Sequence, residues 1–219
     1  MKSLLFKIKT NLFLCLLLPP LLLSGCSIAS SGKDKKVLKI AAWQYNDSQI
    51  DLDKLTINAV KLYGQDLINA LPKDIKDYCP NYKNATNEKK TQFWTALISS
   101  LSYFESTHSS TVSYAEKFTN SKGKTVVSRG LLQISLESSN GYQCDVTQEN
   151  QLHQPRVNLE CGVKILSHLV KKDAVISAKK QKLMGKSSWL GAARYWSPFR
   201  DDVKNKTMAL NTKMQAYCQ

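Results

Sequence analysis

The chain has 219 residues and a formal net charge of +14, with 31 Lys+Arg against 17 Asp+Glu. This length predicts one compact domain with a processed N-terminus. The charge favours a polyanionic partner, and six cysteines without a C-x-x-C pair argue against a zinc site.

The first residues have the pattern of a secretory signal. Three lysines precede an apolar run over residues 12–23, which ends in Leu23-Ser24-Gly25-Cys26. This tetrad resembles a bacterial lipobox, in which the cysteine is diacylated and becomes the mature N-terminus. An uncleaved membrane anchor is the alternative, but Pro19-Pro20 and the short span argue against it. We therefore expect a lipoprotein signal peptide at 1–25, a lipidated tether at 26–45 and a folded domain at 46–219.

Removal of the signal peptide leaves a strongly basic chain. Without the three leader lysines, 28 Lys+Arg face 17 Asp+Glu, a net charge of about +11. Export argues against nucleic acid as the partner, whereas an anionic cell-wall polymer or a lipid surface fits. A generally solvated basic face is the alternative interpretation.

Four cysteines remain after Cys15 in the signal and Cys26 at the lipid site. In an exported chain an even number predicts disulfides, here two bonds with three possible pairings. We favour Cys144–Cys161, which closes a short loop, and Cys79–Cys218, which ties the first helical segment to the C-terminus. The shorter loop would stabilise the fold by about 3 kcal/mol on a chain-entropy account.

The rest of the chain is mostly helical in its spacing of apolar residues. In chain order we expect a helix at about 50–71, a loop at 80–90, a helix at 89–106 entered through Thr86-Asn87, a hairpin with strands near 112–118 and 124–127, and helical segments near 131–139, 157–170, 187–195 and 203–217. The sequence predicts a mainly α (α+β) fold with a small β-hairpin beside the 89–106 helix.

Glu105 interrupts the apolar stripe of that helix. Apolar residues at 94, 97, 98 and 101 share one face, and Glu105 follows Leu101 by four residues on the same face. Partial desolvation there disfavours the charged carboxylate and raises its pKa. A carboxylic acid that stays protonated near neutrality is the proton donor needed for glycosidic bond cleavage. The alternative is a solvated side chain at a fraying helix end.

Three segments resemble lytic transglycosylases of the lysozyme-like superfamily, in order and in approximate spacing. Residues 99–106 end in Glu-Ser, as their catalytic helix does. Ser128-Arg129-Gly130-Leu131-Leu132-Gln133-Ile134 is similar to their Ser-x-Gly-Leu-Met-Gln-Ile segment, and 158–166 resembles their Asn-Ile-x-x-Gly-x-x-x-Leu helix. The resemblance covers roughly residues 90–200. It implies a lysozyme-like catalytic domain that cleaves peptidoglycan.

The resemblance also implies substrate-binding residues. These are Ser128, Gly130, Gln133, Tyr195 and Trp196. Gly130 would let the backbone pass close to a sugar; the alternative is that it only starts a helix. Gln133 would bind an N-acetyl or hydroxyl group of the sugar; the alternative is that it only caps a helix or packs inside the protein. Trp196 stands where the family's Ala-Tyr-Asn-x-Gly run has Asn, and would either stack on a sugar or anchor the core.

The transglycosylase reaction needs one carboxyl group. Glu105 would protonate the bridging oxygen between N-acetylmuramic acid and N-acetylglucosamine, then take the proton from the C6 hydroxyl to give a 1,6-anhydro product, with no cofactor and no metal. A hydrolytic lysozyme would use a second carboxylate. Glu116 on the predicted hairpin is our candidate, and Glu137 and Asp145 are weaker ones. A non-enzymatic wall-binding lipoprotein is a third hypothesis.

The expected partners follow from these features. They are peptidoglycan glycan strands and a membrane, reached through lipid on Cys26; an envelope-spanning machine is a further candidate, and we expect a monomer. The predicted location is the cell envelope. Because Ser27 rather than aspartate follows Cys26, a host with an outer membrane would carry the protein on that membrane's periplasmic face.

Overall fold

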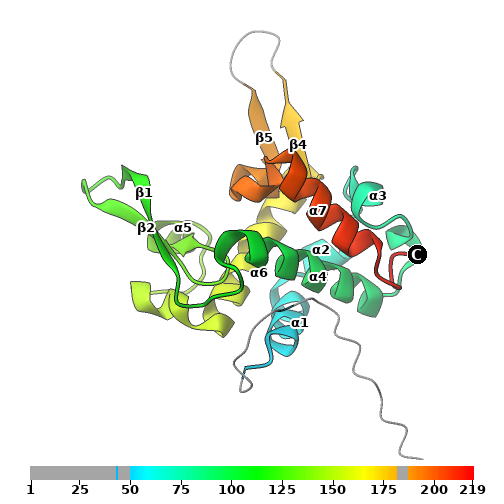
Figure 1. The fold of residues 1–219 in the computed structure, drawn as a ribbon, viewed down its shortest axis with the longest axis horizontal. Helices are drawn as coiled ribbons and strands as arrows, with labels where there is room; N and C mark the ends of the chain where they lie inside the picture. The colour runs from blue at the N-terminus through cyan, green and yellow to red at the C-terminus, as the bar shows by residue number, and fades with distance from the viewer. Residues whose placement is uncertain (1–42, 44–49, 182–186) are drawn as a thin grey trace, which may run out of the picture. The chain divides into compact units, whose positions relative to one another are not determined.

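A computed structural model describes residues 43, 50–181 and 187–219 of the chain (Figure 1). The predicted signal peptide, Cys26 and all of the tether except Trp43 lie outside the described residues. The helices are α1 (Leu52–Tyr63), α2 (Gln65–Asn69), α3 (Ile75–Tyr78), α4 (Asn87–Ser106), α5 (Leu136–Gly141), α6 (Pro155–Asp173) and α7 (Asp202–Lys213). The strands are β1 (Ser113–Thr119), β2 (Thr125–Arg129), β3 (Ile134–Ser135), β4 (Ser177–Lys180) and β5 (Ser188–Gly191). The mainly helical fold with a small hairpin is as predicted.

Within the described residues, four short 3-10 helices connect these elements. They are η1 (Tyr82–Asn84), η2 (Glu149–His153), η3 (Ala192–Arg194) and η4 (Ser197–Phe199). No helix among the described residues is long and apolar enough to cross a bilayer.

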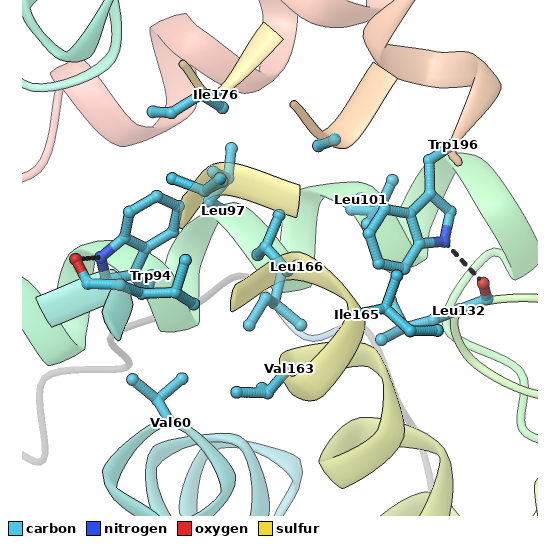
Figure 2. Packing of buried hydrophobic residues seen from close by; sticks show 14 of the residues in the cluster. Val60, Trp94, Leu97, Leu101, Leu132, Val163, Ile165, Leu166, Ile176 and Trp196 are labelled. Atoms are coloured by element: carbon cyan, nitrogen blue, oxygen red, sulfur yellow. Dashed lines mark hydrogen bonds between the residues drawn. The ribbon is translucent and has the colours of Figure 1, made fainter. Parts of the chain in front are cut away.

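Helix α4 is surrounded by other elements and forms the centre of the core. It contacts α1, α2, α7 and η4, and its Phe93, Trp94, Leu97 and Leu101 side chains are buried. Figure 2 shows Trp94 and Trp196 at opposite ends of the buried cluster, with Leu97 and Leu166 between them. Because tight packing disfavours movement of a core helix, α4 is a rigid support for the residues in its last turn.

The two ends of α4 are defined by local chemistry. The Thr86 hydroxyl accepts a hydrogen bond from the Lys89 backbone N–H at 3.3 Å and caps the start. At the other end Thr107 has a left-handed backbone with φ of 50°, which stops the helix. The Ser106 hydroxyl donates to the Leu131 carbonyl at 3.0 Å. The helix therefore ends one residue after Glu105 and is tied to the segment that follows β2.

Strands β1, β2 and β3 form one antiparallel sheet in that order. Ala115 of β1 pairs with Val127, but Thr119 pairs with Thr125. Residues 116–118 of β1 therefore lie opposite the single residue Val126 of β2, which is a β-bulge. Bulges bend a strand and redirect its side chains, and they are common next to active sites.

Three segments differ from the sequence-based prediction. Of the helix expected at 131–139, residues 131–135 form a turn and strand β3 instead, and α5 begins only at Leu136. The helix expected at 187–195 is instead β5 followed by η3, and β5 pairs with β4, which the sequence did not indicate. The reason is the partner: Ser177–Lys180 lies alongside Ser188–Gly191, and this pairing outweighs a helix-like spacing. The helix expected at 50–71 is also divided, because Gly64 separates α1 from α2.

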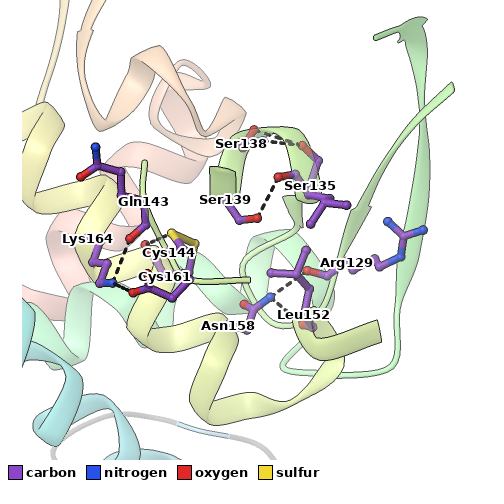
Figure 3. The surroundings of a disulfide bond; sticks show 12 residues. Arg129, Ser135, Ser138, Ser139, Gln143, Cys144, Leu152, Asn158, Cys161 and Lys164 are labelled. Carbon is purple, nitrogen blue, oxygen red and sulfur yellow. Dashed lines mark hydrogen bonds and ion pairs between the residues drawn. A yellow bond between two sulfur atoms is a disulfide. The ribbon is translucent and has the colours of Figure 1, made fainter. Parts of the chain in front are cut away.

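Both favoured disulfides are present. Cys79–Cys218 joins residues 139 apart in sequence, and Cys144–Cys161 joins residues 17 apart. The first connects the end of α3 to the C-terminus. The second fastens the loop after α5 to α6, as Figure 3 shows.

Candidate active site

Glu105 opens onto a cleft of about 440 Å³. Three parts of the chain line this cleft: the β1–β2 hairpin, the stretch from Gln133 to Ser138, and residues 194–197 with Arg200. The sequence placed Glu105 at the end of an apolar helix face, and the structure places it there, half-buried at the edge of the cleft.

The surroundings of Glu105 raise its pKa from 4.5 to about 7. Burial is the main cause, because a carboxylate loses its hydration there. The positive charge of Lys204 acts in the opposite direction, the negative charge of Glu116 raises the pKa further, and Arg200 lowers it. At neutral pH a substantial fraction of Glu105 is therefore protonated and able to donate a proton.

Glu116 faces the same cleft from the hairpin. It lies in the bulge of β1 and is half-buried. The Ser128 hydroxyl, on the neighbouring strand, donates a hydrogen bond to Glu116 Oε1 at 2.7 Å. Ser128 thus orients a carboxylate, a role more specific than the direct sugar contact expected from the sequence. Glu105 and Glu116 thus line one cleft in different environments. A third carboxyl group, that of Glu137, also lines the cleft, but it is exposed and accepts a hydrogen bond from Asn120 Nδ2 at 2.8 Å.

Gly130 is needed for packing inside the protein. Its φ is +74°, and a Cβ atom there would lie 2.2 Å from the Leu152 carbonyl oxygen and 2.6 Å from Asn158 Nδ2. Only glycine adopts this backbone without strain. Gly130 is not among the residues that line the cleft, so the close approach it allows is to the protein's own backbone rather than to a sugar.

Gln133 lines the cleft and has a left-handed φ of 47°. Its Nε2 donates to the carbonyls of Gly130 at 2.8 Å and Val112 at 3.2 Å. Its buried Oε1 has no hydrogen-bond partner among the described residues. A buried acceptor without a partner costs free energy, which a hydrogen bond from a ligand in the cleft would recover.

Asn158, which the sequence marked only as part of a motif, holds this segment in place. It is fully buried in α6. Its Oδ1 accepts from the Leu132 N–H at 2.9 Å. Its Nδ2 donates to the Arg129 carbonyl at 2.9 Å and to the Leu152 carbonyl at 2.8 Å, and Figure 3 shows these two bonds. These three bonds fix the backbone that leads into Gln133.

Tyr195 and Trp196 have different positions. Tyr195 is half-buried in the cleft wall, and burial is the main cause that raises its pKa to about 12, against hydrogen bonds to Ser138 and Ser135. Trp196 is only 2% exposed, and its Nε1 donates to the Leu132 carbonyl at 2.9 Å (Figure 2). With no ring face free for a sugar, Trp196 serves as a core anchor, the second of the two sequence-based alternatives.

Arg200 supports the cleft wall opposite the hairpin. Its Nε donates to the Ala193 carbonyl at 2.5 Å, and its Nη2 donates to the Arg194 carbonyl at 2.7 Å. Arg194 in turn forms a bidentate ion pair with Asp173. Nothing in the sequence indicated this arrangement, because it depends on carbonyl groups of a turn that the periodicity predicted to be helical.

The described residues contain no group of three or more His, Cys, Asp or Glu arranged to hold a metal ion. The side chains that line the cleft carry carboxyl, hydroxyl, amide and guanidinium groups.

Comparison with known proteins identifies the family. The sequence matches no protein-family model and no curated protein. Wild-type DslA of Bdellovibrio has 33% sequence identity with this chain over 82% of the chain and 97% of DslA, with a TM-score of 0.74. The chain belongs to the lysozyme-like family of DslA.

Two variants of DslA are similar to the chain as well. Each is 32% identical to it, with TM-scores of 0.75 and 0.74. In each variant one glutamate of DslA is replaced by glutamine, and the two substituted positions are 11 apart in that protein. Glu105 and Glu116 of the present chain have the same separation.

Proposed function

We propose that the protein is a peptidoglycan-cleaving glycosidase that breaks the β-1,4 bond between N-acetylmuramic acid and N-acetylglucosamine by hydrolysis. Glu105 is the proton donor and Glu116 is the second carboxylate. One observation carries the proposal: Glu105, with a pKa of about 7, shares a cleft with a second, oriented carboxyl group.

The reaction follows the roles of two carboxyl groups in glycoside hydrolysis. Glu105 gives its proton to the bridging oxygen as the bond from this oxygen to the anomeric carbon breaks. The Glu116 carboxylate stabilises the positive charge that develops on the sugar ring, and takes a proton from the water that attacks the anomeric carbon. The products are one strand with a new reducing end and one with a free hydroxyl group.

The surroundings of Glu116 favour hydrolysis over the reaction expected first from the sequence. The transglycosylase came first there because three segments of the chain resemble that family. Glu116 now has a hydrogen-bond donor, Ser128, that fixes its orientation, and its charge acts on Glu105. The matching separation of the two substituted glutamates in DslA also supports a pair.

Transglycosylation is the second candidate. It is supported by the segment from Ser128 to Gln133, which resembles that of lytic transglycosylases. It is also supported by Tyr195, because the negative charge of Glu105 contributes to the raised pKa of its hydroxyl. In this reaction Glu105 would take back a proton from the C6 hydroxyl, and Glu116 would not be required.

We also propose that lipid on Cys26 anchors the protein in the cell envelope, next to its wall substrate. The net positive charge of the chain would attract it to an anionic surface, which supports this location. Labelling with a radioactive fatty acid tests the anchor: wild-type protein should take up label and Cys26→Ala should not.

Three variants test the proposed reaction on purified sacculi. Glu105→Gln should lose at least 100-fold in the rate of wall clearing, because a general acid contributes at least that much, yet should still sediment with sacculi. Glu116→Gln should lose a comparable factor if water is activated by this residue. Glu88→Gln, a solvent-exposed change at the far end of α4, is the control and should be active.

The outcomes separate the hypotheses. An active Glu116→Gln together with an inactive Glu105→Gln would support transglycosylation over hydrolysis. Wild-type protein that binds sacculi but never clears them would identify a non-enzymatic wall-binding module.

A further inference from the structure

Phe118 is an apolar side chain that faces water at the cleft. It lies on β1, is 60% exposed and lines the cleft together with Glu105 and Glu116. Leaving a large aromatic ring in water forfeits the free energy that its burial would give. A ligand that covers the ring would recover it.

We propose that Phe118 is a stacking platform for a sugar ring of the bound glycan, next to the ring whose bond is broken. This inference rests on the proposed function and adds a substrate-binding residue to the same cleft. The site would take the apolar C–H face of a pyranose.

The side chains of Glu116 and Phe118 lie on the cleft side of the hairpin. Glu116 and Phe118 are two residues apart, and both line the cleft, whereas the exposed Lys117 between them does not. In a strand, residues two apart project from the same face, roughly 6–7 Å apart at ordinary strand rise. This separation suits a carboxylate at the reacting sugar and an aromatic ring at a neighbouring one.

The tip of the hairpin is held in place before any ligand binds. Asn120 Oδ1 accepts hydrogen bonds from the backbone N–H groups of Lys122 at 3.0 Å and Lys124 at 3.1 Å, and its Nδ2 donates to Glu137 Oε1 at 2.8 Å. The last bond ties the turn to α5. Preorganisation lowers the conformational entropy that is lost on binding. Because the hairpin tip is already ordered, stacking of a sugar on Phe118 would lose little entropy from this segment.

A phenyl ring suits this task because it has no polar group. Aromatic rings bind through a large flat surface with specific geometry. A benzyl side chain has no hydrogen-bonding group, so it does not discriminate between sugars that carry hydroxyl and sugars that carry acetamido substituents. Phe118 would therefore increase affinity for the polymer chain, while hydrogen-bonding groups such as Gln133 would select the substituents.

Tyr114 provides a matched control on the same strand. It is 52% exposed, about as much as Phe118, but it does not line the cleft. If Phe118 only contributed to hairpin stability, replacing either aromatic residue should have similar effects.

The test measures binding of soluble glycan strands, released from sacculi by sonication, to full-length protein carrying Glu105→Gln. In this background Phe118→Ala should weaken binding about tenfold, Phe118→Trp should restore it, and Tyr114→Ala should bind normally. In active protein Phe118→Ala should raise KM with little change in kcat. The melting temperature of each variant checks the fold.

Binding by Phe118→Ala within twofold of the parent would overturn the inference. So would an equal loss in Tyr114→Ala, or a loss accompanied by a lower melting temperature that Phe118→Trp fails to correct. The proposed function fails by a different result, which is wall clearing by the Glu105→Gln protein, and that result leaves the binding comparison intact.

Discussion

Glu105→Gln should make the protein more stable at alkaline pH while it removes activity. The pKa of Glu105 is raised from 4.5 to about 7 in the folded state, so the folded protein holds this proton more tightly than the unfolded chain does. Below pH 4.5 both states are protonated and the ionisation has no effect. Between pH 4.5 and 7 the unfolded state loses its proton first, and the folded state loses stability as the pH rises.

The size of the effect follows from the shift. One pKa unit corresponds to about 1.36 kcal/mol, so the cost of charging Glu105 above pH 7 approaches about 3 kcal/mol. Glutamine is close in shape and has no charge, and it removes this cost. Partial access of water reduces the gain, and we expect about 2–3 kcal/mol at pH 8 relative to pH 4, or roughly 4–12 °C in melting temperature.

Urea denaturation of wild type and Glu105→Gln at pH 4 and pH 8 measures this difference. Any effect of the amide itself is the same at both pH values and cancels. Glu88→Gln, an exposed change in the first turn of α4, shows what the loss of one surface charge does. A stability difference between wild type and Glu105→Gln that is equal at both pH values would refute the raised pKa.

Two further predictions concern the supports of the site. Asn158→Ala removes three buried hydrogen bonds and should cost about 3–4 kcal/mol in urea denaturation, whereas the exposed Asn140→Ala should stay within about 0.5 kcal/mol; equal effects would refute the role of Asn158. The positive charge of Lys204 lowers the pKa of Glu105 and partly offsets the effect of burial. Lys204→Met removes this charge, so the pH at which kcat/KM falls on the alkaline side should be higher than in wild type. A fall at the same or a lower pH would contradict this.

The parts of the fold that depend on nearby residues were predictable from the sequence. Helix α4 and its Thr86 cap follow from apolar spacing and a capping side chain within a few residues. Both disulfides are the pairing favoured from the number and spacing of the cysteines, under the expectation that the chain is exported. Strand β4 and the true structure of 187–195 could not be predicted, because each depends on its pairing with the other.

The candidate site shows the same division. Glu105 could be selected because its position breaks a local pattern. Glu116, Glu137 and Asp145 look alike as carboxyl groups in a sequence. In the structure Asp145 does not line the cleft, and Glu137 lines it but is exposed and bound to Asn120. Glu116 is distinguished by the Ser128 hydrogen bond and by its negative charge, which raises the pKa of Glu105. The burial of Trp196 depends on the Leu132 carbonyl, 64 residues earlier.

The chemical identity of the products tests the central claim most directly. Sacculi digested by wild-type protein in heavy-oxygen water can be analysed by mass spectrometry of the released fragments. Hydrolysis by Glu105 and Glu116 predicts new reducing ends on muramic acid that carry the heavy oxygen, and no such ends from Glu105→Gln. Fragments that end in 1,6-anhydro sugar without label, or no released fragments at all, would contradict it.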